Sequence, residues 1–125
     1  MPDSNSGSAS GDGLCQLIRL NFSGAVIHSS NTLFAVPIDL NIVATFPLLE
    51  SIFQSLIESN THSEAYEYFA VETTFPGLDG FYDFRFVVLE EFGENVIDWT
   101  ICDRTTYYRQ IQADQQKNNE AKLRN

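Results

Sequence analysis

The segment FYDFRFVVLEE, residues 81–91, decides the fold class because its side chains alternate in character. The apolar ones fall on one face of an extended chain: Tyr82, Phe84, Phe86 and Val88. Asp83 and Arg85 fall on the opposite face. A repeat of two residues is typical of a β-strand with one buried face. We therefore predict a strand here, with an aromatic face turned to the core.

Two further strands are predicted on either side of this segment. Residues 66–75 are aromatic and β-branched, and we expect one face to hold Phe69, Val71, Thr73 and Phe75. Residues 96–103 alternate again, with an inward set of Ile97, Trp99 and Ile101. Turn residues fill both gaps, at 76–80 and 92–95. Connections this short predict an antiparallel meander.

The first part of the chain predicts a hairpin followed by helical segments. Ile18, Leu20 and Phe22 alternate with polar residues, and Ser23-Gly24 marks a turn into a second strand at 25–29. Residues 30–32 could cap a short apolar helical segment at 33–36, which Pro37 would end.

The clearest helix is predicted from Thr45, as a cap, to about Ser59. Pro47 suits its first turn, where a missing N–H costs nothing. The apolar side chains recur at helical spacing: Leu48, Leu49, Ile52, Phe53, Leu56 and Ile57. Strands and helices in separate stretches of the chain therefore predict an α+β fold class.

Residues 107–125 contain neither glycine nor proline and predict a C-terminal exit helix. Its apolar stripe is thin, so it would be marginal alone and needs a partner. A possible seam is polar: Gln115, Asn118 and Lys122. The pattern runs to the last residue without a C-cap, so we expect the chain to continue. The predicted parts are a disordered lead-in (1–13), a domain (14–106) and the exit helix (107–125).

Composition limits the function classes. The 125 residues suit one domain, and the net charge of −10 argues against nucleic acid and against an anionic membrane surface. No stretch approaches the ~18 apolar residues of a membrane span, so we expect no direct membrane insertion. Cys15 and Cys102 are far apart and form no CxxC pair. We expect two reduced structural thiols in a cytoplasmic protein.

The predicted order of elements resembles the PAS sensor domain across residues 14–125. The resemblance implies a five-stranded antiparallel sheet with helices on one face. Residues 23–31 look like that family's second strand, which follows a turn glycine and ends in asparagine. Residues 79–84 resemble its turn into the fourth strand, and Asp103-Arg104-Thr105 its Asp-x-Thr after the fifth. Residues 108–120 look like the linker helix of bacterial sensor kinases. The segment between Pro37 and Phe46 is shorter than the family's small helices.

The resemblance implies a sensory and dimerisation domain of a bacterial two-component system. Such a domain would form a homodimer and relay a signal through the C-terminal helix to an effector in the same chain, such as a histidine kinase. Asp103 and Thr105 would be its relay residues. Asp103 can also cap the exit helix, since its carboxylate complements the positive helix end.

The apolar side chains predicted to face the interior fit two interpretations. They could line a pocket for a small hydrophobic ligand, or they could fill an ordinary core. The pocket candidates are Ile52, Phe53, Leu56, Phe69, Phe84, Phe86, Trp99 and Ile101. No covalent-flavin cysteine lies in 38–58, and His62 is a weak haem candidate. No catalytic or metal-binding motif is present, so we expect no enzyme. The alternatives are a small α+β enzyme using Asp83, Asp98 or Asp103 as acid or base, and a pocketless protein-interaction domain.

Overall fold

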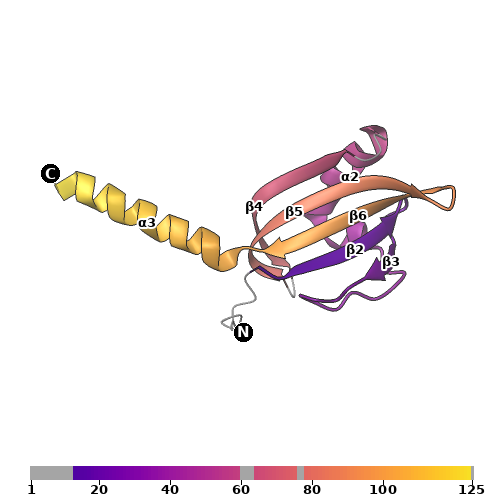
Figure 1. Ribbon diagram of the computed structural model, residues 1–125, viewed down its shortest axis with the longest axis horizontal. Coiled ribbons are helices and arrows are strands. Elements are labelled where there is room, and N and C mark those ends of the chain that lie inside the picture. Colours follow the sequence, from indigo (N-terminus) through magenta and orange to yellow (C-terminus); the bar gives the residue numbers. More distant parts are fainter. Residues whose placement is uncertain (1–12, 60–63, 76–77, 125) are drawn as a thin grey trace, which may run out of the picture.

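One antiparallel sheet of five strands organises the protein. The computed structural model describes residues 13–59, 64–75 and 78–124. The strands are β2 (Cys15–Asn21), β3 (Val26–Ser29), β4 (Ala65–Phe75), β5 (Leu78–Glu91) and β6 (Glu94–Asp103). Their order across the sheet is β3-β2-β6-β5-β4 (Figure 1). Strands β2 and β6, the first and last within the described residues, therefore lie side by side.

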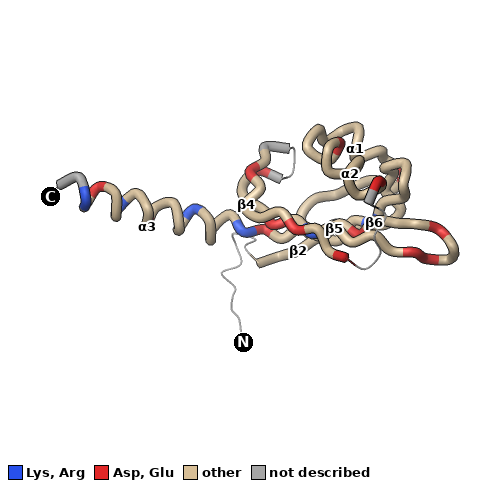
Figure 2. Tube along the Cα trace, turned by 90° about the horizontal axis from the view of Figure 1, so that it is seen from above, with Lys and Arg blue, Asp and Glu red and all other residues tan. Residues whose placement is uncertain are grey.

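Helices α1 (Ile42–Thr45) and α2 (Pro47–Ser59) lie on one face of the sheet (Figure 2). The largest buried side chains come from this face and from the helices: Trp99, Phe84, Phe86, Ile18, Leu20, Ile42, Leu49, Leu56, Ile97 and Ile101. The α+β class, the five antiparallel strands and the helices on one face are confirmed. Leu48, expected on the apolar side of α2, is exposed instead.

The residues before α2 differ from the prediction. No helix forms at 33–36, because Gln16 holds this segment as a loop. The buried Gln16 side-chain oxygen accepts from the backbone N–H groups of Leu33 and Phe34, at 2.8 and 2.9 Å. Thr45 does not cap α2 but ends α1, whose own cap is Asn41.

A β-bulge in β4 overturns the predicted inward face of that strand. Tyr68 pairs with Phe84 and Val71 with Tyr82, so Phe69 and Ala70 together oppose the single residue Asp83. Ala70 adopts a left-handed φ of 55°. The extra residue shifts the alternation, because a one-residue slip exchanges the two faces of a strand. Phe69 is consequently 64% exposed, and its expected place in the core is wrong.

Cys15 and Cys102 form a disulfide bond, so the expectation of reduced thiols is wrong. The two residues are separated by 87 positions in sequence. Strands β2 and β6 pair antiparallel and place them at facing positions, with Cα atoms 4.1 Å apart. Spacing in sequence carries no information on such a contact between the two ends of the domain.

The exit helix α3 (Thr105–Arg124) projects from the end of the sheet beside the start of β2 (Figure 1). It begins two residues earlier than predicted, and residues 112–122 are all exposed. Basic residues recur along it, whereas acidic residues gather at the far turn between β5 and β6 (Figure 2). Across the described ranges, none of the helices is both long and apolar enough to span a membrane. The predicted lead-in lies outside the described residues, except for Gly13.

Candidate relay site at the base of the exit helix

Thr105, the first residue of α3, is hydrogen-bonded to the backbone of β5. Its hydroxyl oxygen accepts from the N–H of Phe81 at 3.1 Å and lies 3.3 Å from the Phe81 carbonyl oxygen, to which the hydroxyl donates. The carboxylate of Asp103 accepts from the Thr105 N–H at 3.0 Å. Asp103 is only 8% exposed. The two predicted relay residues therefore lie together, where the sheet passes into the helix.

Tyr108, one turn further along α3, makes a second attachment to β5. Its hydroxyl donates to the Asp83 carboxylate at 2.8 Å. The same Asp83 oxygen also accepts from the N–H of Ala70 at 3.1 Å. Burial, and then the bond to Asp83, raise the pKa of the Tyr108 hydroxyl. Asp83 thus joins the bulge of β4 to the exit helix.

We call these two attachments the helix clasp: Thr105 with Phe81, and Tyr108 with Asp83. Gly80 allows it to close. A Cβ added at Gly80 would lie 2.3 Å from the Thr105 hydroxyl oxygen, and the φ of Gly80 is +146°. Only a residue without a side chain permits so close an approach of β5 to α3.

Sequence reasoning found Asp103 and Thr105 but missed Asp83, Tyr108 and Gly80 as partners. Asp83 was assigned correctly to the outer face of its strand, yet nothing in its spacing indicated a tyrosine 25 residues later. The available clue was Gly80, which lies within β5, since a glycine in a strand often marks a close approach of another backbone.

The predicted ligand-pocket residues, apart from Phe69, are brought together in the core. They are 8% exposed or less: Ile52, Phe53, Leu56, Phe84, Phe86, Trp99 and Ile101. The rings pack on one another, with Phe84 edge-on to Trp99 at 5.2 Å and Phe86 stacked on it at 5.7 Å. The Trp99 indole N–H is buried and has no acceptor within the described part of the chain.

The remaining chemical candidates lie apart from one another. Asp98 forms a two-pronged ion pair with Arg19, with N–O distances of 2.7 and 2.9 Å. That bond to Asp98 is the main cause that raises the pKa of Arg19. Asp83 and Asp103 are bound to α3 as described. Within residues 13–59, 64–75 and 78–124, no three His, Cys, Asp or Glu side chains are placed to hold a metal ion. His28 is exposed, and His62 lies outside the described residues.

Comparison with known proteins adds no relative. No protein-family model, curated protein or solved structure matches this chain.

Proposed function

We propose that this chain is a PAS-like sensory and dimerisation domain of a bacterial signal-transduction protein. It would work in the cytoplasm and pass the state of its sheet through α3 to an effector such as a histidine kinase. The helix clasp carries the proposal. It joins the exit helix to β5 directly and to the β4 bulge through Asp83.

The helix clasp suits a relay because it attaches the first turn of a helix whose remaining length is largely exposed. Beyond Ile111, every described side chain of α3 lies in solvent. An exposed polar helix is marginal alone, so its stability depends on its attachments. A change in the sheet that moves Phe81 or Asp83 would shift the position or the population of the helix.

The exposed part of α3 supports the dimerisation role. Exposed residues at spacings of three and four fall on one stripe: Gln115, Asn118 and Lys122. Polar residues on such a seam make a weak coiled coil, which a relay can shift. Gln115→Leu should strengthen self-association, while the matched Gln116→Leu, off the stripe, should not. Sedimentation equilibrium measures both, and equal association of the two variants would contradict the seam.

A fusion tests the relay itself. The full chain is joined after Asn125 to the dimerisation and catalytic parts of a histidine kinase, in register with the stripe. Thr105→Val removes the bonds to Phe81, and Thr106→Val is the control because Thr106 is exposed. We expect Thr105→Val and Asp103→Ala to change autophosphorylation at temperatures well below melting, where both variant domains are still folded. The fall in their melting temperatures should be too small to explain the change. Unchanged phosphorylation in both, with the fused kinase active, would contradict the relay.

A further inference from the structure

The disulfide lies at the junction of the sheet with the exit helix. Cys102 directly precedes Asp103, whose carboxylate binds the first N–H of α3. The Asp103 backbone also pairs with the incoming chain, accepting from Gly13 N–H at 2.8 Å and donating to the Leu14 carbonyl at 2.9 Å. The bridge therefore fastens the two segments that enter and leave the domain.

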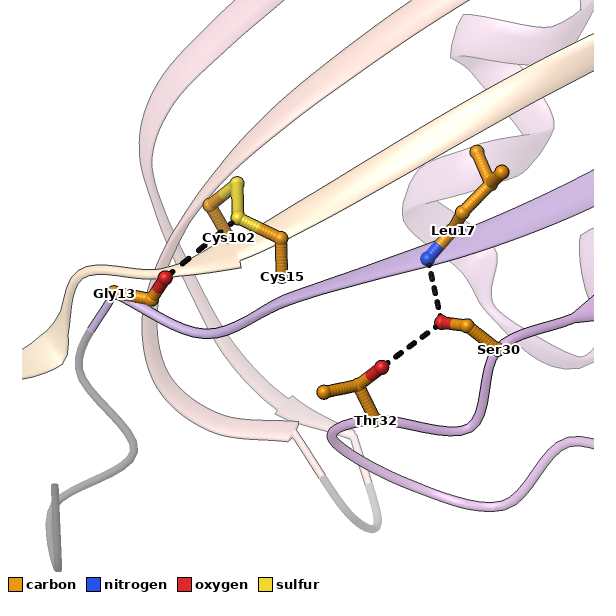
Figure 3. The surroundings of a disulfide bond; sticks show 6 residues. All are labelled: Gly13, Cys15, Leu17, Ser30, Thr32 and Cys102. Carbon is orange, nitrogen blue, oxygen red and sulfur yellow. Dashed lines mark hydrogen bonds between the residues drawn. A yellow bond between two sulfur atoms is a disulfide. The ribbon is translucent and has the colours of Figure 1, made fainter.

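Solvent reaches the two cysteines unequally. Cys15 is exposed, whereas Cys102 is half-buried on the outer face of the sheet. Figure 3 shows the bonded sulfur atoms beside Gly13, with the Cys15 sulfur 3.9 Å from the Gly13 carbonyl oxygen. A disulfide sulfur carries no proton, so this contact becomes a hydrogen bond only when Cys15 is a thiol. An external thiolate can therefore reach the Cys15 sulfur. Once reduced, the Cys15 thiol can donate to the Gly13 carbonyl oxygen.

Cys102 lines a groove on the outer face of the sheet that carries charges of both signs. Two arginines line this groove, Arg85 and Arg104, together with Phe69, Thr100 and the carboxylates of Glu67 and Asp83. The Asp83 charge is shared with two donors, the Tyr108 hydroxyl and the Ala70 N–H. A thiolate released at Cys102 would therefore lie in this groove, beside two arginines and two carboxylates.

The geometry points to a thiol–disulfide exchange site at Cys15–Cys102, which takes a small thiol reductant and sets the attachment of α3. A reductant thiolate attacks the Cys15 sulfur, and Cys102 leaves as a thiolate that takes a proton from water. A second reductant thiolate then attacks the reductant sulfur of the mixed disulfide, and Cys15 leaves as a thiolate that takes a proton from water. The two electrons come from the reductant, which ends as its own disulfide.

Reduction should loosen the base of the exit helix. Without the bridge, the start of β2 is still held to the end of β6 by the backbone bonds of Gly13 and Leu14 to Asp103, and the ends of paired strands open more readily than their centres. Asp103 takes part in those bonds and in the cap of α3, so opening weakens both. This inference rests on the proposed relay and adds an input to it. Bridges in a reducing cytosol are usually transient, which agrees with an exchangeable one.

The experiment uses the full chain in glutathione buffers of graded oxidised-to-reduced ratio. Alkylation and mass spectrometry count the free thiols, and acid quenching of the oxidised chain early in its reaction with reduced glutathione traps the mixed disulfide for mapping. Hydrogen exchange of residues 103–108 reports the base of α3. The double variant Cys15→Ser/Cys102→Ser is the control. It cannot form the bridge, so the reductant should not change its hydrogen exchange.

We expect reduction within the range of a cytosolic glutathione pool, the mixed disulfide on Cys15, and severalfold faster exchange at residues 103–108. A bridge that stays closed across that range would overturn the proposal and indicate a permanent structural link. Adducts on Cys102 would overturn the assignment of the attacked sulfur, and unchanged exchange would overturn the effect on α3. The kinase fusion, assayed without reductant, tests the relay separately, so the two failures are distinguishable.

Discussion

Removing the Cys15–Cys102 bridge should lower the free energy of unfolding by an amount that follows from the closed loop. The cysteines are 87 residues apart, so the bridge restricts nearly the whole unfolded domain. Loop-closure entropy for such a length corresponds to about 4.6 kcal/mol at 25 °C, near the top of the range for disulfides. A domain of this size has roughly 5–15 kcal/mol of stability, so we expect the reduced chain to stay folded but to unfold at lower urea.

Urea unfolding followed by tryptophan fluorescence measures this loss. Trp99 is the sole tryptophan and is fully buried, so its emission reports the core. The oxidised chain, the reduced chain and Cys15→Ser/Cys102→Ser are compared, and reductant should not shift the double variant. A loss under about 1 kcal/mol would refute the loop-closure reasoning, because it would mean that the unfolded chain is not restricted by the bridge.

Three further predictions concern the core and the clasp. Trp99→Ala should cost about 3–5 kcal/mol in urea unfolding, and Trp99→Phe distinctly less, because the indole N–H has no acceptor in the described structure to lose. Gly80→Ala should destabilise by roughly 1–3 kcal/mol through the clash with Thr105, and Thr105→Ala in the same chain should restore part of the loss. Because the pKa of Tyr108 is raised on folding, its contribution is complete below pH ~10 and is lost as the pH rises through the folded value. Tyr108→Phe should therefore flatten the alkaline fall in stability, and an equally steep fall in both proteins would contradict this assignment.

The sequence predicted the elements whose pattern is local. Strand β5 and helix α2 show their periods directly, and α2 ends at Ser59 as predicted. The turn at Phe92-Gly93 is compact, with left-handed φ at both residues, as the sequence of turn residues indicated. The capping role of Asp103 could also be predicted from the sequence, because its bond reaches only two residues along the chain, to the N–H of Thr105.

What the sequence could not show depends on contacts between distant segments. The disulfide needs the register of β2 on β6, and the placement of Phe69 needs the bulge in β4. Neither register nor bulge leaves a local pattern, since Phe69 continues a regular alternation with Val71 and Thr73. The clasp partner Asp83 reads as an ordinary solvent-face residue for the same reason.

Hydrogen exchange along α3 tests most directly whether the exit helix is coupled to the sheet. Asp83→Ala breaks the bonds to Tyr108 and Ala70. Asp98→Ala is the control, because it also removes a strand carboxylate but breaks the ion pair with Arg19 instead. The two variants are compared under conditions of equal global stability. We expect faster exchange in residues 105–111 with Asp83→Ala and wild-type exchange with Asp98→Ala. Equal exchange in both variants would contradict a relay through the helix clasp.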